Sequence, residues 1–153
     1  MLSFTASLSP NSTAFALFVT EKYDYKDAKG ILSKDITKKI DLFLKSLKEK
    51  KQKDEISSLD ISEKKKCFII KIKNKFENYY FEEIGGSFFT YIKNYKTINS
   101  VDIYADSLNE NKDKLSKLFS EFIFGFNLKS YTFNKYKTLN KEKINKKVNY
   151  KII

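Results

Sequence analysis

The chain has 153 residues and a formal net charge of +11, with 41% hydrophobic and 16% aromatic residues. This length suits one domain with a single hydrophobic core, and the apolar content is too high for an intrinsically disordered chain. All 30 basic residues are lysines, and the sequence has no histidine. It therefore lacks the commonest general base and metal ligand, and also the arginine fork that reads phosphates and guanine edges.

The positive charge is unevenly distributed. Residues 34–75 and 129–153 each sum to +7, whereas residues 1–33 sum to zero and residues 76–128 to −3. Solvated lysine-rich faces are the simpler interpretation. A DNA-binding regulatory module that uses these two regions is the alternative.

A cytoplasmic location is predicted from the cysteine content and the N-terminal sequence. Cys67 is the only cysteine, so we interpret it as a small core residue and not as a disulfide partner or reactive thiol. The first residues lack the basic start and apolar run of a secretory signal, and no window reaches the roughly 18 apolar residues of a membrane helix. We expect no membrane partner.

The first half of the chain predicts two strands and a helix. Residues 2–6 alternate apolar and polar side chains, and residues 14–20 form an almost continuous apolar run, as in a strand covered on both faces. An apolar stripe at helical spacing predicts a helix over 36–51, with Ser33 or Asp35 as its N-cap. The polar passage that follows includes residues 56–61, which fit either a short edge strand or a loop.

Strands are next predicted at 66–72 and 79–84, the second running through Gly85 and Gly86 into a helix over 87–96. Two glycines between a strand and a helix are a place where an α/β fold can hold a phosphate, because helix-start N–H groups are free there. Gly85 and Gly86 are therefore candidate ligand-binding residues. A purely conformational role for the two glycines is the alternative.

The last part of the chain predicts a strand within 97–105 and a helix over 112–126. Gly125 is expected to favour termination of this helix. Residues 148–153 fit an edge strand or a linker. Strands that alternate with helices of 10 to 15 residues indicate an α/β sheet with helices on both faces.

The sequence offers no catalytic or metal-binding residues. Its carboxylate pairs are Asp54-Glu55, which we expect to be solvated in a lysine-rich loop, and Glu82-Glu83, whose side chains would point to opposite faces of the predicted strand. A hydrolase cannot be assembled from these groups alone.

The segment after the last predicted helix resembles the end of the N-terminal domain in the leucyl aminopeptidase (cytosol aminopeptidase) family. That family has the pattern Gly-x-x-Leu-x-Ser-Tyr-x-Phe-x-x-Tyr-Lys-Thr, and the matching residues here are Gly125, Leu128, Ser130, Tyr131, Phe133, Tyr136, Lys137 and Thr138. The resemblance implies a macrodomain-like three-layer α/β/α fold with a mixed, largely parallel sheet, in which the strand at 14–20 is central.

The resemblance also implies a two-domain organisation in which each domain has its own role. Residues 1–138 would form the non-catalytic N-terminal domain, and residues 139–153 a linker or edge strand towards an absent C-terminal catalytic domain. That domain would hold two divalent metal ions, zinc or manganese, and remove N-terminal residues from peptides. The N-terminal domain would contribute to hexamer assembly and active-site access. A macrodomain-like nucleotide binder, of the fold that elsewhere binds ADP-ribose, is a further alternative.

Overall fold

The computed structural model describes residues 2–4, 8–27, 29–75, 79–108, 110, 112–131 and 149–152. They form a six-stranded sheet in the order β1-β6-β5-β2-β4-β3. The strands are β1 (Leu2–Phe4), β2 (Ala14–Val19), β3 (Ile56–Ser62), β4 (Lys65–Lys71), β5 (Ser100–Tyr104) and β6 (Asn149–Ile152). The helices are α1 (Lys34–Glu49), α2 (Tyr80–Ile92), the 3₁₀ turn η1 (Ala105–Ser107) and α3 (Lys112–Ser130).

The sheet is mixed and largely parallel, as predicted. β2 lies between β4 and β5 and is parallel to both, which confirms its expected central place. Of the strands that the structure describes, β3 alone runs antiparallel, against β4. The passage that the sequence left undecided is therefore a strand, and it lies at one edge of the sheet.

The C-terminal strand β6 does not lie at an edge. It is parallel to β5 on one side and to β1 on the other, so β1 takes the edge position. β1, formed by the first residues of the chain, thus covers the outer side of β6. Local sequence patterns do not indicate this pairing between the two ends of the chain. The polar run at residues 141–147 lies outside the described residues.

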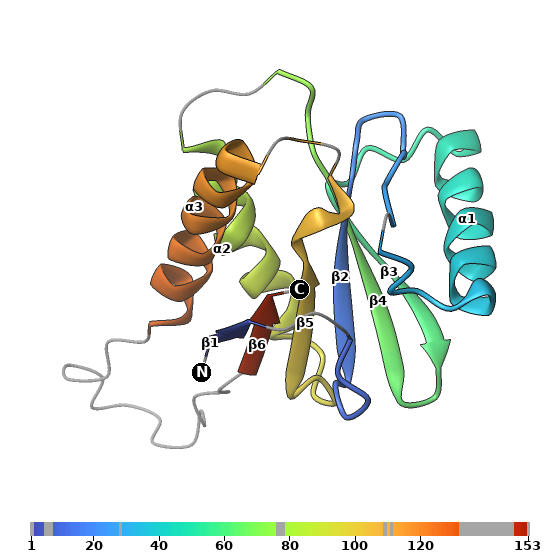
Figure 1. The fold of residues 1–153 in the computed structure, drawn as a ribbon, viewed down its shortest axis with the longest axis horizontal. Coiled ribbons are helices and arrows are strands. Elements are labelled where there is room, and N and C mark those ends of the chain that lie inside the picture. The colour runs from blue at the N-terminus through green and yellow to red at the C-terminus, as the bar shows by residue number, and fades with distance from the viewer. Residues whose placement is uncertain are drawn as a thin grey trace.

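The helices cover the two faces of the sheet. Figure 1 shows α1 on one side and α2 with α3 on the other. Alternate residues of β2 serve the two cores, because successive side chains of a strand point to opposite faces. Phe15 and Leu17 pack with α1, whereas Ala16 and Phe18 pack with α2 and α3. Helix α1 has the predicted cap, since the Ser33 hydroxyl accepts the Ile36 N–H at 3.4 Å.

The prediction of a strand at residues 79–84 is wrong. Those residues, from Tyr80 on, form the first turns of α2, and Tyr79 precedes the helix in a left-handed conformation with φ of +69°. The aromatic run suggested a strand because aromatic residues favour sheets. Tertiary burial decides otherwise, because the buried side chains recur at helical spacing: Tyr80, Phe81, Ile84, Phe88, Phe89 and Ile92.

Helix α3 is longer than predicted, and Gly125 does not end it. The helix continues to Ser130, and its buried aromatic residues pack against the sheet. Phe18 of β2 meets Phe119 and Phe122 edge to face, with ring centroids 4.8 and 5.2 Å apart. Such pairs add about 0.5–1.5 kcal/mol to the energy of burying the rings.

Candidate functional site at the carboxyl ends of the parallel strands

Ligands of open α/β sheets bind outside the carboxyl ends of the strands, at the point where the strand order reverses. In this sheet that point is the end of β2, because the chain leaves β2 towards β3 and β4 on one side and later returns as β5 on the other. Two connections meet there: residues 20–33, which lead from β2 to α1, and η1, which follows β5.

An aspartate holds the first connection in place. Asp27 accepts hydrogen bonds from the backbone N–H groups of Ile31 at 2.8 Å and Leu32 at 2.9 Å. The Tyr104 hydroxyl, at the end of β5, donates to the same carboxylate at 2.7 Å. Asp27 thus links the two connections across the end of the sheet.

Ser107 of η1 links the same segments a second time. Its hydroxyl donates to the Tyr104 carbonyl at 2.7 Å and accepts the Phe18 N–H at 2.9 Å, while its own carbonyl accepts the Lys26 N–H at 2.9 Å. The side chain is fully buried. An exposed ion pair between Lys29 and Asp106, 2.5 Å long, adds a third link.

Hydrogen bonding within this network moves the pKa values of Asp27 and Tyr104 in opposite directions. Burial alone would raise the pKa of Asp27, but hydrogen bonds from Tyr104, Leu32 and Ile31 outweigh it and lower the pKa. The pKa of Tyr104 is raised, first by burial and then by its bond to the Asp27 carboxylate. Asp27 is therefore a charged hydrogen-bond acceptor and Tyr104 a neutral donor across the physiological pH range.

These polar groups bond to one another and are not left free for a ligand. Among the described residues, no buried side-chain nitrogen or oxygen lacks a hydrogen-bond partner. The position where an α/β fold usually receives a ligand is thus bridged by its own side chains. Sequence reasoning missed this network, since Asp27 and Tyr104 are 77 positions apart and neither belongs to a recognisable motif.

The structure places Gly85 and Gly86 in the middle of α2, away from any turn between a strand and a helix. A Cβ at Gly85 would lie 2.0 Å from the Phe122 carbonyl oxygen of α3, so this glycine allows two helix backbones to approach. Gly86 is less confined, because the nearest atom to a Cβ built there is the Gly125 carbonyl oxygen at 3.6 Å. The free helix-start N–H groups on which the phosphate hypothesis depended are absent at this position.

Gly86 borders an open groove of about 1210 Å³ between the start of β3 and the outer sides of α2 and α3. Four carboxylates line the groove: Asp54, Glu55, Glu82 and Glu83. Glu55 is paired with Lys73 at 3.0 Å. Among the described residues that line the groove, Lys129 is the one lysine. This charge favours cationic groups and opposes a phosphate.

The expected separation of Glu82 and Glu83 across a strand is wrong, because both lie in the first turn of α2. The surplus negative charge at a helix start is electrostatically favourable, since helix N-termini carry partial positive charge. Within the described part of the chain, no three His, Cys, Asp or Glu side chains are placed to hold a metal ion. Cys67 is fully buried, and burial raises the pKa of its thiol, as expected for a core residue.

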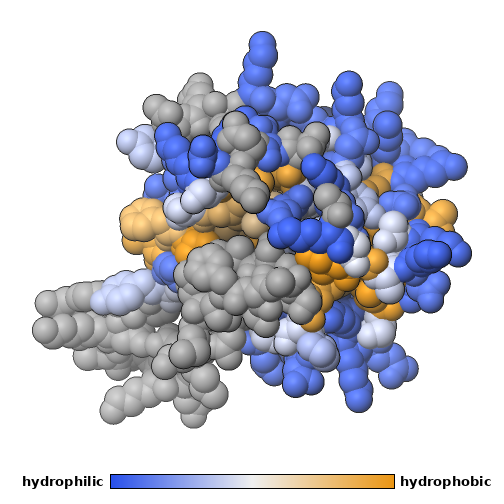
Figure 2. All heavy atoms as spheres, in the orientation of Figure 1, coloured by the Kyte–Doolittle hydropathy of each residue, from blue (hydrophilic) through white to orange (hydrophobic). Residues whose placement is uncertain are grey.

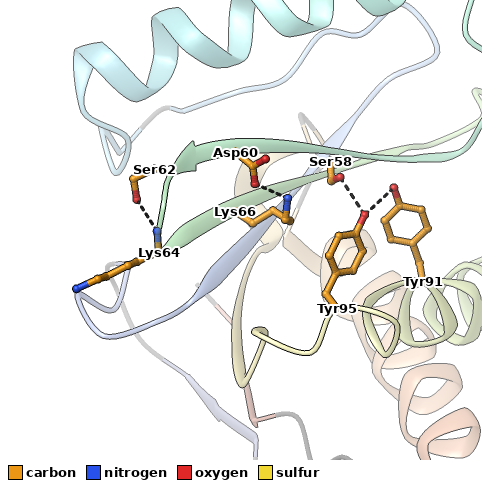
Figure 3. A network of polar contacts seen from close by, with 7 residues as sticks. All are labelled: Ser58, Asp60, Ser62, Lys64, Lys66, Tyr91 and Tyr95. Atoms are coloured by element: carbon orange, nitrogen blue, oxygen red, sulfur yellow. Dashed lines mark hydrogen bonds and ion pairs between the residues drawn. The ribbon is translucent and has the colours of Figure 1, made fainter.

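A hydroxyl cluster lies beside this groove, at the face of β3 and β4 that α2 covers (Figure 3). The hydroxyls of Ser58 and Tyr95 are 3.1 Å apart, and the Tyr95 hydroxyl donates to that of Tyr91 at 3.4 Å. Burial would raise the pKa of Tyr95, but the bonds to Ser58 and Tyr91, together with the charge of Lys66, lower it. Lys66 is held by an ion pair with Asp60 on the neighbouring strand.

No protein-family model and no curated protein sequence matches the chain. Solved structures do match it. The macrodomain of Thermus aquaticus DarG has a TM-score of 0.64 at 13% identity, over 99% of this chain and 97% of that one. A mutant of tomato leucine aminopeptidase has a TM-score of 0.68 at 10% identity, over 99% of this chain and 32% of that one.

At these identities the likeness shows the fold. The chain has a macrodomain-like α/β fold that a leucine aminopeptidase also contains, which confirms the fold predicted from the sequence resemblance. The chain spans about a third of the aminopeptidase chain that it matches. No helix in the described ranges has the length and apolar character needed to cross a membrane.

Proposed function

We propose that this chain is the non-catalytic N-terminal domain of a cytoplasmic leucyl aminopeptidase-type metallopeptidase. The observation that carries the proposal is the bridged strand end, where Asp27, Tyr104 and Ser107 bond to one another in the place that a ligand would otherwise occupy. The fold shared with tomato leucine aminopeptidase supplies the parent enzyme class. The domain then acts through packing and surface contacts and performs no bond-breaking chemistry.

In this proposal the two divalent metal ions, zinc or manganese, belong to the catalytic domain of the parent protein. They would activate a water molecule and polarise the peptide carbonyl there. The present domain would contribute to assembly of the hexamer and to control of access to the active sites. Its principal partner would be its own catalytic domain.

An aminopeptidase assay tests the proposal. The 153-residue chain and the product of its complete reading frame are each incubated with leucine p-nitroanilide, with zinc or with manganese. We expect release of p-nitroaniline by the complete product alone. Metal-dependent turnover by the 153-residue chain, abolished by a chelator, would show that the chemistry resides in this domain and would overturn the proposal.

A nucleotide-binding macrodomain is the second candidate, and one observation favours it. The chain covers 97% of the DarG macrodomain, so the match is with a whole domain. Titration calorimetry with ADP-ribose separates the two functions. The bridged strand end predicts no measurable heat of binding, whereas saturable binding that Tyr104→Phe changes would favour the nucleotide binder.

A DNA-binding module is the third candidate, supported by the net charge of +11. Exposed lysines follow the outer face of α1, among them Lys38, Lys45 and Lys48. Figure 2 shows hydrophilic side chains around much of one face of the molecule, with smaller hydrophobic patches between them. A gel shift at low salt that disappears as the salt concentration rises would support DNA binding, and its absence at low salt would exclude it.

A further inference from the structure

Among the described residues, strand β3 is paired with a strand on one side only, namely β4. Its hydrogen-bonding pattern shows which of its backbone groups are directed outwards. The Lys71 N–H donates to the Glu55 carbonyl at 2.8 Å, and the register of β3 on β4 continues from that pair. Bonded and non-bonded pairs alternate along antiparallel strands. The backbone groups of Ser57 and Leu59 therefore point to β4, and those of Ile56, Ser58 and Asp60 point away from the sheet.

This edge carries few of the devices by which proteins block strand addition. Natural edges are protected by charged residues, proline, strong bulges or a covering segment. In β3 the single charged residue is Asp60, which is engaged by Lys66, and the irregularity lies at the far end, between Asp60 and Ser62. No second strand pairs with β3 among the described residues. Its outer side is a template for another strand.

The sequence of β3 suits an antiparallel copy of itself. A twofold axis at Ser58 places Ser58 opposite the partner's Ser58 and Ile56 opposite the partner's Asp60. All three outward residues are then in bonded pairs, which gives about six hydrogen bonds. No like charges face each other in this register, whereas an axis at Asp60 would oppose two carboxylates and cost stability.

The same register also brings Lys64 to a groove of opposite charge. It brings the partner's Ser62 beside Asp54 and Glu55, so the exposed turn that follows, Glu63-Lys64, lies next to the groove that these residues line with Glu82 and Glu83. The groove is open, and Lys64 is exposed. Twofold symmetry repeats this contact at the other end of the strand pair. Contact between Lys64 and these carboxylates therefore favours a second copy of this chain over an acidic partner.

We propose that the outer edge of β3 is a self-association surface, at which two copies of the chain pair their β3 strands antiparallel about Ser58 and form one continuous sheet. Lys64 in the turn of each copy then lies on the acidic groove of the other. This inference depends on the sheet edge and its charges and not on the proposed peptidase relationship, so either one can fail alone.

Sedimentation velocity of the full 153-residue chain over a range of concentrations tests the proposal. We expect a monomer–dimer equilibrium that shifts towards monomer as salt rises, because the terminal contacts are ionic. Ser58→Pro removes the outward N–H without breaking a bond to β4, and it should raise the dissociation constant at least about tenfold, as expected for two lost hydrogen bonds. Ser58→Ala keeps that N–H and should dimerise as the wild type does.

Charge reversal tests the register. Lys64→Glu should weaken the dimer. Adding Glu82→Lys to the same chain should restore it, because the new glutamate at position 64 of each copy then faces the new lysine at position 82 of the other. Amide exchange offers a readout that needs no variant: the Ile56 and Ser58 amides should exchange at least about tenfold more slowly in the dimer than in dilute monomer. A chain that stays monomeric at millimolar concentration, or a dimer unaffected by Ser58→Pro, would overturn the proposal.

Discussion

Gly125 of α3 lies directly against Glu82 of α2, so that a Cβ at position 125 would fall 1.9 Å from the Glu82 carbonyl oxygen. Gly85 makes the reciprocal contact, with the Phe122 carbonyl oxygen 2.0 Å from the position of its missing Cβ. Two glycines on facing helices thus let α2 and α3 pack backbone to backbone. This contact positions the aromatic residues that fill one of the two cores.

Replacing either glycine with alanine should destabilise the protein. For Gly85→Ala and Gly125→Ala the added methyl meets backbone atoms that cannot rotate away, so we expect the free energy of unfolding to fall by about 3 kcal/mol. Gly86→Ala is the matched control in the same helix. Its Cβ would meet ordinary contacts from 3.6 Å, and alanine favours the helix, so stability should be unchanged or rise by up to about 1 kcal/mol. Urea unfolding measures all three.

A second prediction concerns the bond between Asp27 and Tyr104. Asp27→Asn replaces one of the two acceptor oxygens with an N–H₂ donor. The backbone N–H of Ile31 or of Leu32 then loses its hydrogen-bond acceptor. We expect a loss of about 1–3 kcal/mol at neutral pH. Asp24→Asn, at an exposed site in the same connection, should change stability by less than about 0.5 kcal/mol.

The loss from Asp27→Asn should also depend on pH. The pKa of Asp27 is lower in the folded state, so its charged form contributes stability above the unfolded pKa of about 4, and that contribution is lost as the pH falls through the folded value. The difference between wild type and Asp27→Asn should therefore shrink below about pH 4. A difference that stays constant from pH 7 to pH 3 would show that the carboxylate charge has no part in it.

The thiol of Cys67 supplies a probe of global opening. The side chain is fully buried and burial raises its pKa, so Ellman's reagent should label the native protein at least about 10³-fold more slowly than the protein in urea. Thionitrobenzoate absorbance at pH 8 gives both rates. Equal rates would mean that β4 opens locally or that Cys67 is not in the core.

Much of the fold could be predicted because α1 and β2 carry patterns that no other structure satisfies as well. The stripe through Ile40, Leu44 and Leu47 fits only a helix, and the uncharged run of β2 fits a strand covered on both faces. The start of α2 was mispredicted because Tyr80 and Phe81 favour strands locally, while their burial against α3 becomes visible only in three dimensions.

The candidate site was much less predictable. Gly85 and Gly86 drew attention as a short motif, yet Gly85 serves helix packing. The residues that bridge the strand ends, Asp27, Tyr104 and Ser107, are ordinary in sequence and meet only because β2 and β5 are neighbours. Of the segment that carried the family resemblance, Leu128 and Tyr131 are exposed at the end of α3, and residues from 132 to 138 lie outside the described part of the chain.

The central proposal is that this domain is part of a two-metal aminopeptidase whose catalytic groups lie in another domain of the same protein. The most direct measurement is the nucleotide sequence of the gene beyond the codon for Ile153. We predict an uninterrupted frame that encodes a second, larger domain with metal-binding carboxylates, such as the aspartate and glutamate of the Asn-Thr-Asp-Ala-Glu-Gly-Arg stretch that the resemblance to leucyl aminopeptidases implies. A stop codon directly after Ile153, or a following domain without metal ligands, would contradict the account.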